Sequence, residues 1–424
     1  MKLRFWLLLS LLACLATWLY AVRISWPWVR HRGETVDGIK TQLWDLYPRW
    51  VGTRELLLHS RNPYGPEVSH EIQMAFYGHI VDQDYRQRGH KIDEQRFAYP
   101  VYVVFLMAPV MHLDFSEVYR WAPFVLAFFA ALSVPLCLQL LHWRPPWQHV
   151  AALTLFTLAS PQIVQGLEHQ QLSVVVGFLL IAAAWCVSRH HLLSGGALLA
   201  CSTLKPQMAF FPLCFFLVWV VGDLSKRWRL LVGFLATLTV LITAGELILP
   251  GWVGYFIEGA NAYRKYFPTT SVLRIVLGDA AGEIVGGIIV AGLLFLAWRN
   301  RKENAGSRQF ILTLAAFLTG TILAFPLFTP FNQVLLILPT ILLLRDWKTL
   351  PKFSRAIFVV SVSWPWIISA ILLLSHLRPD SPSRLPLLPS VLVPFFPLVL
   401  PLLFMTGPGN ARCSELQITS SQRP

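Results

Sequence analysis

"FWLLLSLLACLATWLYAV", residues 5–22, decides the fold class of this chain. The run follows a short basic start, "MKLR", and is long enough to cross the hydrocarbon core of a bilayer as a helix. A signal peptide is the alternative, and "LLAC" weakly resembles a lipoprotein cleavage site. We expect an uncleaved first span, because the rest of the chain is too apolar for a secreted product.

The composition extends this conclusion to the whole chain of 424 residues. Hydrophobic residues make up 55% of it, charged residues only 13%, and the mean hydropathy is +0.55. These values are far from those of soluble proteins. The sequence therefore predicts an all-α, polytopic integral membrane protein.

Apolar runs of spanning length recur after a polar segment, and they predict about twelve transmembrane helices. After the first span they lie at 118–141, 150–166, 171–188, 191–204, 206–222, 229–249, 283–298, 309–328, 331–344, 355–376 and 386–404. The expected parts are a first helix (1–22), a loop with juxtamembrane helices (23–117), a core module (118–249), a second loop (250–282), a C-terminal module (283–404) and a tail (405–424).

Basic clusters predict the orientation of these spans. "SKRWR" (225–229), "RNRK" (299–302) and "RDWKTLPKFSR" (345–355) are short loops that should be cytoplasmic. Both termini are then cytoplasmic and residues 23–96 lie outside. The apolar stretch 99–113 is short for a crossing, so we expect a helix that lies on, or dips into, the outer face of the membrane.

Charge and cysteine content point to no other partner or cofactor. The net charge of +13 is explained by basic residues that flank spans, so we expect membrane lipids and no nucleic acid as partners. The six cysteines are scattered through apolar segments without paired spacing. They predict neither a disulfide framework nor a metal site.

"WDLYPRW" (44–50) places one carboxylate, Asp45, among Trp44, Tyr47 and Trp50. A desolvated carboxylate on the outer face is suited to act as a general base. A surface ion pair with Arg49, four residues later on the same helix, is the structural alternative. Further acids in the outer loops compete for the role of base: Glu55, Glu67, Glu71, Asp82, Asp84, Asp93, Glu94 and Glu168.

Further polar residues gather at the predicted outer face. "GLEHQQLS" (166–173) forms a short turn between spans, and Lys205 in "STLKPQ" lies in the next outer turn. Lys205 could simply reach the lipid headgroups, or it could bind a phosphate as a point charge. The candidate substrate-binding residues are Tyr64 in "RNPYGPE", Tyr99 in "FAYP", Glu168, His169, Gln170, Gln171, Asn332 and Gln333.

These motifs in this order resemble the polyprenol-phosphate-dependent membrane glycosyltransferases with the GT-C fold. The chain is most similar to glycosyltransferase family 87, which includes mycobacterial mannosyltransferases. "NPYGP", "FAYPVYVVFLMAPV", "QQLS" and "LSGGALLACSTLKPQ" carry the resemblance, which covers roughly the first half of the chain. Where some relatives carry a histidine in a late outer turn, this chain has "TPFNQV", with Asn332 and Gln333.

The resemblance implies transfer of a hexose, of mannosyl type, from a polyprenyl phosphate donor to a lipid or glycan acceptor, with inversion. Asp45 matches the acidic base of the family, and Lys205, helped by Arg274, would bind the donor phosphate. A single phosphate leaving group needs less assistance from a metal than a diphosphate, so no metal and no cofactor are expected.

The resemblance also implies a role in cell envelope glycan biosynthesis, at the extracytoplasmic side of a plasma (inner) membrane. We expect a monomer. A transporter or flippase of lipid-linked saccharides is the alternative from another class, but such proteins usually carry ionisable residues near the bilayer midplane and repeated halves. A membrane polymerase or ligase shares the lipid substrate, although its large outer loop usually lies late in the chain.

Overall fold

The computed structural model describes residues 2–20, 43–81, 95–266, 270–325 and 329–376. The expected last span (386–404), the tail (405–424) and four candidate acids, Asp82, Asp84, Asp93 and Glu94, lie outside these ranges. Every regular element in the described ranges is a helix, which confirms the expected all-α class.

The helices follow the predicted apolar runs closely, since each run between 118–141 and 355–376 coincides with one helix or with two consecutive helices. The α-helices are α1 (Lys2–Tyr20), α3 (Leu46–His59), α4 (Pro66–Tyr77), α6 (Val103–Met107), α7 (Phe115–Leu140), α8 (Trp147–Leu158), α9 (Pro161–Glu168), α10 (Ser173–Ser188), α11 (Leu192–Ser202), α12 (Pro206–Val221), α13 (Leu224–Ile248), α14 (Trp252–Tyr266), α15 (Val272–Leu277), α16 (Asp279–Arg299), α17 (Arg308–Ala324), α18 (Ile337–Arg345) and α19 (Lys352–His376). Three 3₁₀ turns join them: η2 (Ala108–Val110), η3 (Pro330–Leu336) and η4 (Trp347–Thr349).

Within the described residues, three helices are both long and apolar enough to cross a membrane. They are α7, α13 and α16, and a fourth span results if the bent pair of α8 and α9 counts as one. Other apolar helices, such as α10, α11, α12 and α17, are shorter. The expected count of about twelve spans therefore stays a prediction.

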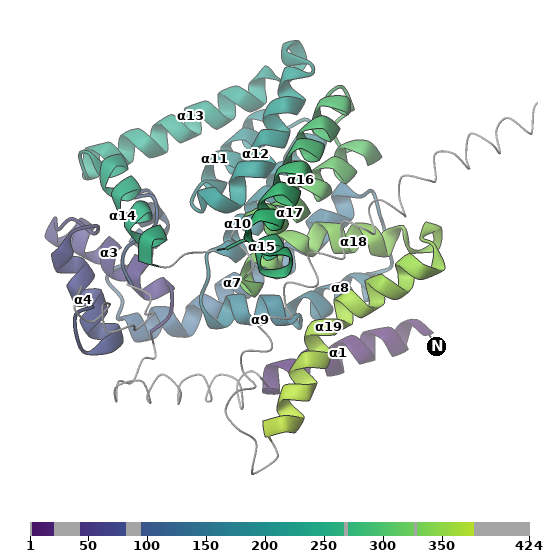
Figure 1. Cartoon of the computed structure of the whole chain (residues 1–424), viewed down its shortest axis with the longest axis horizontal. Helices are drawn as coiled ribbons and strands as arrows, with labels where there is room; N and C mark the ends of the chain where they lie inside the picture. Colours follow the sequence, from purple (N-terminus) through teal and green to yellow (C-terminus); the bar gives the residue numbers. More distant parts are fainter. Residues whose placement is uncertain (1, 21–42, 82–94, 267–269, 326–328, 377–424) are drawn as a thin grey trace, which may run out of the picture.

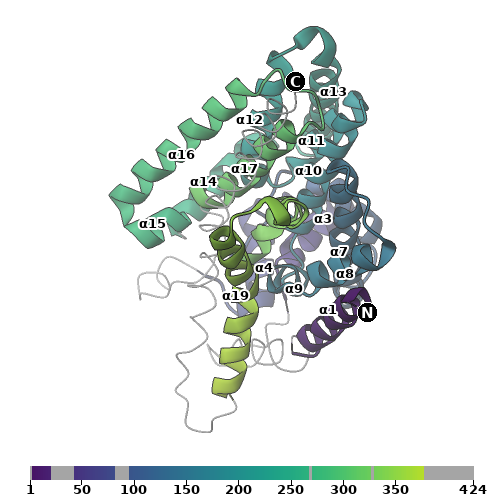
Figure 2. The ribbon, with the colours of Figure 1, turned by 90° about the vertical axis from the view of Figure 1, so that its right-hand side faces the viewer.

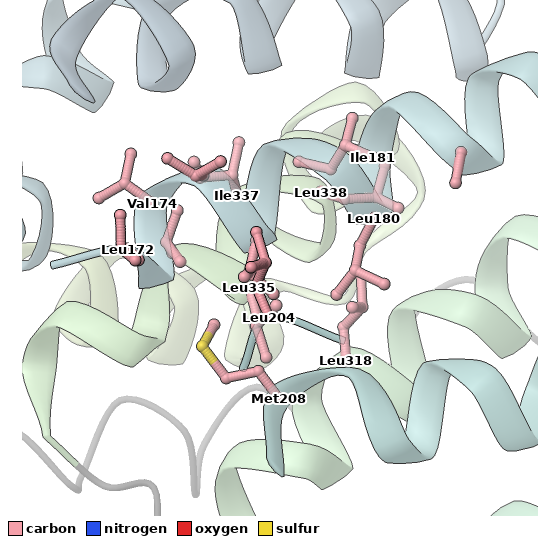
Figure 3. Close-up of a cluster of buried hydrophobic side chains, with 14 of the residues drawn as sticks. Leu172, Val174, Leu180, Ile181, Leu204, Met208, Leu318, Leu335, Ile337 and Leu338 are labelled. Carbon is pink, nitrogen blue, oxygen red and sulfur yellow. The ribbon is translucent and has the colours of Figure 1, made fainter. Parts of the chain in front are cut away.

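The centre of the bundle is α10, which packs against α7, α11, α12 and η3. Its side chains are buried along most of its length. Figure 3 shows the apolar cluster around it, to which α12, α17, η3 and α18 contribute. Because these elements share one apolar core, the start of α10 has a fixed position relative to η3 and to the start of α12.

Two glycines allow α11 and α13 to lie in close contact. A Cβ atom on Gly196 would lie 2.2 Å from the carbonyl oxygen of Leu230, and one on Gly233 would lie 2.2 Å from that of Leu193. Small residues permit such close packing of helices in membranes. Figures 1 and 2 show the two helices side by side, with α12 beside them.

A sharp bend divides the apolar run that the sequence predicts as one span at 150–166. Helices α8 and α9 meet at 56°. Pro161 begins α9, where a missing N–H costs little, and the Ser160 hydroxyl donates a 2.7 Å hydrogen bond to the Thr157 carbonyl. As a result α9 turns across the bundle and packs against η3.

A separate group of short helices, α3, α4 and α6, lies to one side of the bundle (Figure 1). Phe97 packs directly on Gly52 of α3, and Tyr64 donates a 2.6 Å hydrogen bond to the carbonyl of Tyr99. In place of one long helix at 99–113, the structure has α6 followed by η2. This group holds α3, and with it Asp45, against the bundle.

Candidate functional site

Asp45 lies just before the first residue of α3 and accepts a hydrogen bond from the side-chain amide of Gln171. Gln171 belongs to the short turn between α9 and α10. Within the described part of the chain, Asp45 forms no ion pair with Arg49, so the alternative of a simple surface pair does not hold here. The half-buried carboxylate is thus oriented by an amide from the bundle.

Lys205 lies on the other side of the same amide. Its ammonium donates hydrogen bonds to the Ser173 hydroxyl (2.5 Å), to Asn332 Oδ1 (2.9 Å) and to Gln171 Oε1 (3.3 Å). The side chain is only 6% exposed, so Lys205 does not reach toward the membrane surface as an anchor. Gln171 therefore connects a carboxylate to a buried ammonium group.

Two helices begin at this cluster. Ser173 is the first residue of α10, and Lys205 immediately precedes α12. Both are helices of 16 residues, and helix N-termini carry partial positive charge and unpaired N–H groups. The arrangement is therefore suited to bind an anion next to Lys205.

Burial strongly affects the protonation of Lys205. Desolvation, with a smaller contribution from the Arg49 cation, lowers the pKa of Lys205 to about 7, although Asp45 opposes the shift. A buried lysine of this kind gains a full positive charge most readily when an anion binds beside it. The site thus couples anion binding to proton uptake.

Arg49 contributes a second cation. Its guanidinium carbon lies 4.3 Å from the centre of the Tyr99 ring, in a cation–π contact. Within the described residues, its Nε is buried and has no hydrogen-bond partner. The charge of Arg49 also lowers the pKa of Lys205, so the two cations are close enough to interact electrostatically.

The aromatic residues around Asp45 have two different roles. The ring of Trp44 lies 4.6 Å from that of His169, at the edge of the site. Tyr47 and Trp50 instead pack on Phe115, and Trp50 donates a hydrogen bond to the Val110 carbonyl. Among the described ring contacts, Trp44, just before α3, is the one of the three that reaches the "GLEHQQLS" turn.

His169 is held in one tautomer by its own helix. Its Nδ1 lies 3.0 Å from the Gln165 carbonyl, so Nδ1 carries the proton and Nε2 keeps its lone pair. Burial lowers the pKa of His169, although the nearby Asp45 raises it. A neutral imidazole beside Asp45 can accept a hydrogen bond from a hydroxyl group.

The other candidates from the sequence lie at various distances from the cluster. Asn332 touches Lys205, whereas Gln333 accepts a 3.5 Å hydrogen bond from Gln162. Gln170 turns away from the cluster and donates to the carbonyl of Tyr119, and Glu168 is buried. Tyr64 supports the Tyr99 backbone, as described above.

Arg274 is engaged elsewhere. Its guanidinium pairs with Asp279 (2.8 Å) and Glu283 (3.2 Å), both on α16. No contact of the described residues joins it to Lys205 or Asp45. The cation that the structure brings to Lys205 is Arg49 instead.

Sequence reasoning missed Ser173 and assigned Arg49 only to an ion pair. Ser173 is the last residue of the quoted "QQLS" motif, two positions after Gln171. A polar residue at the start of an apolar helix was the available signal. Arg49 offered no such signal, because its partner, Tyr99, comes from another segment.

An apolar groove adjoins the cluster. Its polar lining residues include Gln162, Gln333 and Ser160, and most of the others are apolar, including Phe156, Ile337 and Ile341. Gln333 follows Asn332 in the sequence, so one lining residue of this groove adjoins a residue that contacts Lys205. Within the described ranges, no three histidine, cysteine or acidic side chains gather as metal ligands would.

Comparison with known proteins gives one long match and several short ones. The sequence model of Glycosyltransferase family 87 matches residues 97–326, more than half of the chain. The match includes Gln171, Ser173 and Lys205 and begins after Asp45.

The short matches are to UPF0182 proteins of mycobacteria. Those of Mycobacterium leprae (strain TN) and Mycobacterium tuberculosis (strain ATCC 25618 / H37Rv) are 37% identical over 78 residues, and that of Mycobacterium marinum is 36% identical. Each match covers 18% of this chain but only 8% of the relative's length. No solved structure matches the chain.

Proposed function

The chain belongs to glycosyltransferase family 87, and from this premise we propose that it transfers a hexose, of mannosyl type, from a polyprenyl phosphate donor. The family implies a membrane glycosyltransferase. The acceptor is a lipid or glycan hydroxyl at the extracytoplasmic face. The observation that carries the proposal is the bridge from Asp45 through Gln171 to Lys205.

The phosphate of the donor is assigned to the space between Lys205 and Arg49. A donor phosphodiester carries one negative charge, and the leaving polyprenyl phosphate gains a second as the bond to the sugar breaks. Two cations and two helix N-termini therefore stabilise the later stages of the reaction more than the bound donor. Stronger stabilisation of the transition state than of the bound donor is what raises the rate of the transfer.

Asp45 is assigned the role of general base. As the acceptor oxygen attacks the anomeric carbon, its proton passes to the carboxylate, and the bond from the anomeric carbon to the phosphate oxygen breaks. Attack from the side opposite to the phosphate inverts the anomeric centre. One primary amide, Gln171, separates base from anion site, a separation suited to a sugar placed between them.

The apolar groove supports a lipid-linked donor. A polyprenyl chain needs an apolar surface that begins close to the phosphate site, and the groove beyond Gln162 and Gln333 offers one. A soluble nucleotide sugar carries no lipid chain that could bind to such a surface. Its presence beside Asn332 therefore favours a polyprenyl phosphate over a nucleotide donor.

The test is transfer of labelled mannose by the purified protein in lipid nanodiscs. Synthetic mannosyl polyprenyl phosphate is compared with a nucleotide-linked mannose, using a membrane lipid extract as the acceptor. We expect labelled product from the polyprenyl donor alone. Transfer from the nucleotide sugar only would overturn the donor assignment, and use of another polyprenyl-linked hexose would correct the sugar.

A further inference from the structure

A polar pocket lies at the opposite end of α12 from Lys205. It is lined by His190, Trp219, Asp223, Lys226, Arg227 and Lys302, among others. Helix α12 runs from Lys205 at one end to Gly222 at this pocket, and 16 residues of helix span about 24 Å. The two sites are thus separated by most of the thickness of a hydrocarbon core.

Arg227 organises the wall of this pocket. It is 7% exposed, and its guanidinium stacks 3.9 Å from the Trp219 ring. Its guanidinium donates hydrogen bonds to the carbonyls of Trp219, Arg301, Lys302 and Glu303. These bonds fix the position of the loop between α16 and α17. Within the described residues, no carboxylate forms an ion pair with it. The carbonyl dipoles, the Trp219 ring and the more distant Asp223 carboxylate together stabilise this buried charge.

The remaining charges leave the pocket positive. Lys226 and Lys302 are exposed and line it. Asp223 is the one acid among the lining residues, and it already accepts from Ser225 (2.8 Å) and pairs with Lys226 (3.4 Å). Three cations against one satisfied carboxylate leave a net charge of about +2 for an anion to neutralise.

Exposed apolar side chains flank the lining residues of the pocket in the sequence. Val221 is 64% exposed, Leu224 53% and Trp228 47%, and they adjoin Gly222, Asp223 and Arg227 in the sequence. Exposed apolar side chains contribute little to the binding of a soluble phosphate compound, whereas they can contact the acyl chains of a phospholipid. Basic pockets between membrane helices are typical binding sites for anionic headgroups.

We propose that this pocket binds the phosphate headgroup of an anionic phospholipid from the membrane leaflet opposite to the transfer site. The headgroup contacts Lys226 and Lys302, and the acyl chains lie along Val221, Leu224 and Trp228. The bound lipid braces α12, α13 and the loop at 299–307 against one another. The proposal is independent of the sugar, the donor and the acceptor.

The experiment measures lipid binding by native mass spectrometry and thermal stability of the protein in detergent. The added probes are phosphatidylglycerol, phosphatidylcholine and glycerol 3-phosphate. The test variant is Lys226→Gln with Lys302→Gln, and the matched control is Lys348→Gln with Lys352→Gln, two exposed lysines outside the pocket. Arg227 is left intact because its loss disturbs the fold.

Phosphatidylglycerol should bind to the parent and raise its melting temperature, and phosphatidylcholine should not. The test variant should bind phosphatidylglycerol about ten- to thirtyfold more weakly, whereas the control should match the parent. Equal binding by the test variant, or an equal loss in the control, overturns the proposal. Binding of glycerol 3-phosphate as tight as that of the lipid shows a site for soluble phosphates and overturns it as well.

Discussion

Gln171 donates a hydrogen bond to Asp45 across 126 positions of the sequence. This contact joins a helix at the side of the bundle to the turn at which α10 begins. The same amide accepts a hydrogen bond from the ammonium group of Lys205. The position of the Asp45 carboxylate therefore depends on the position of this ammonium group. The predictions below test this coupling from both ends.

Lys205→Met should weaken binding of the donor by about tenfold or more, since a charged hydrogen bond is worth about 1.5–3 kcal/mol. The fold should persist, because methionine fills the buried space without a charge to desolvate. Equilibrium binding of a short-chain mannosyl polyprenyl phosphate provides the measurement. Unchanged affinity would show that Lys205 supports structure only.

Donor binding should depend on pH through the same residue. The pKa of Lys205 in the free protein is lowered to about 7, whereas the donor phosphodiester keeps one negative charge throughout the neutral range. Binding should therefore be strongest below pH 7 and weaken above it, approaching tenfold per pH unit. Titrations at pH 6.5 to 9 give the slope.

Lys205→Met is the control for this pH dependence and should give a flat profile from pH 7 to 9. His169 does not interfere in this range, because burial lowers its pKa below the ordinary value of 6.5. A slope of the same size in the variant would assign the titration to another group.

Arg49→Gln should weaken donor binding about tenfold and lower the transfer rate, because the leaving phosphate loses one of its two cations. Arg49→Lys should restore part of the affinity. The Tyr99→Phe variant keeps the ring under Arg49 and is the matched control. If Arg49→Gln leaves both affinity and rate unchanged, the guanidinium has a packing role.

Glu55→Gln distinguishes a structural acid from a catalytic one. Glu55 is buried and pairs with Arg61 (2.6 Å) and His59 (3.2 Å), and Arg61 in turn pairs with Glu71 of α4 (3.0 Å). Its loss should cost about 1.5–3 kcal/mol of stability while each folded molecule keeps its transfer rate. A rate loss of a hundredfold in a stable variant would make Glu55 the base.

The sequence predicts the helical class and the positions of most helices, because apolar runs of spanning length are an unambiguous signal. It also identifies Asp45, Gln171, Lys205 and Asn332 as candidates. It could not show that Lys205 contacts Asn332, since 127 residues separate them and only the packed bundle brings them together.

Other features depend on local contacts that the sequence does not show. The apolar run at 150–166 reads as one span, yet Ser160 and Pro161 bend it at 56°. Arg49 stands four residues after Asp45, a spacing typical of an ion pair, but the Tyr99 ring offers it a competing contact. Arg274 finds its partners on the neighbouring α16.

The most direct test of the central claim is single-turnover transfer of labelled mannose from a synthetic polyprenyl phosphate donor by Asp45→Asn. The asparagine keeps the size of the side chain but cannot accept a proton. Asp114→Asn, a change at an exposed aspartate before α7, is the matched control, and thermal stability verifies folding. We predict a rate loss of about a hundredfold to ten-thousandfold for Asp45→Asn, with donor affinity kept and Asp114→Asn unchanged. A stable Asp45→Asn protein that transfers mannose at the parental rate would contradict the account.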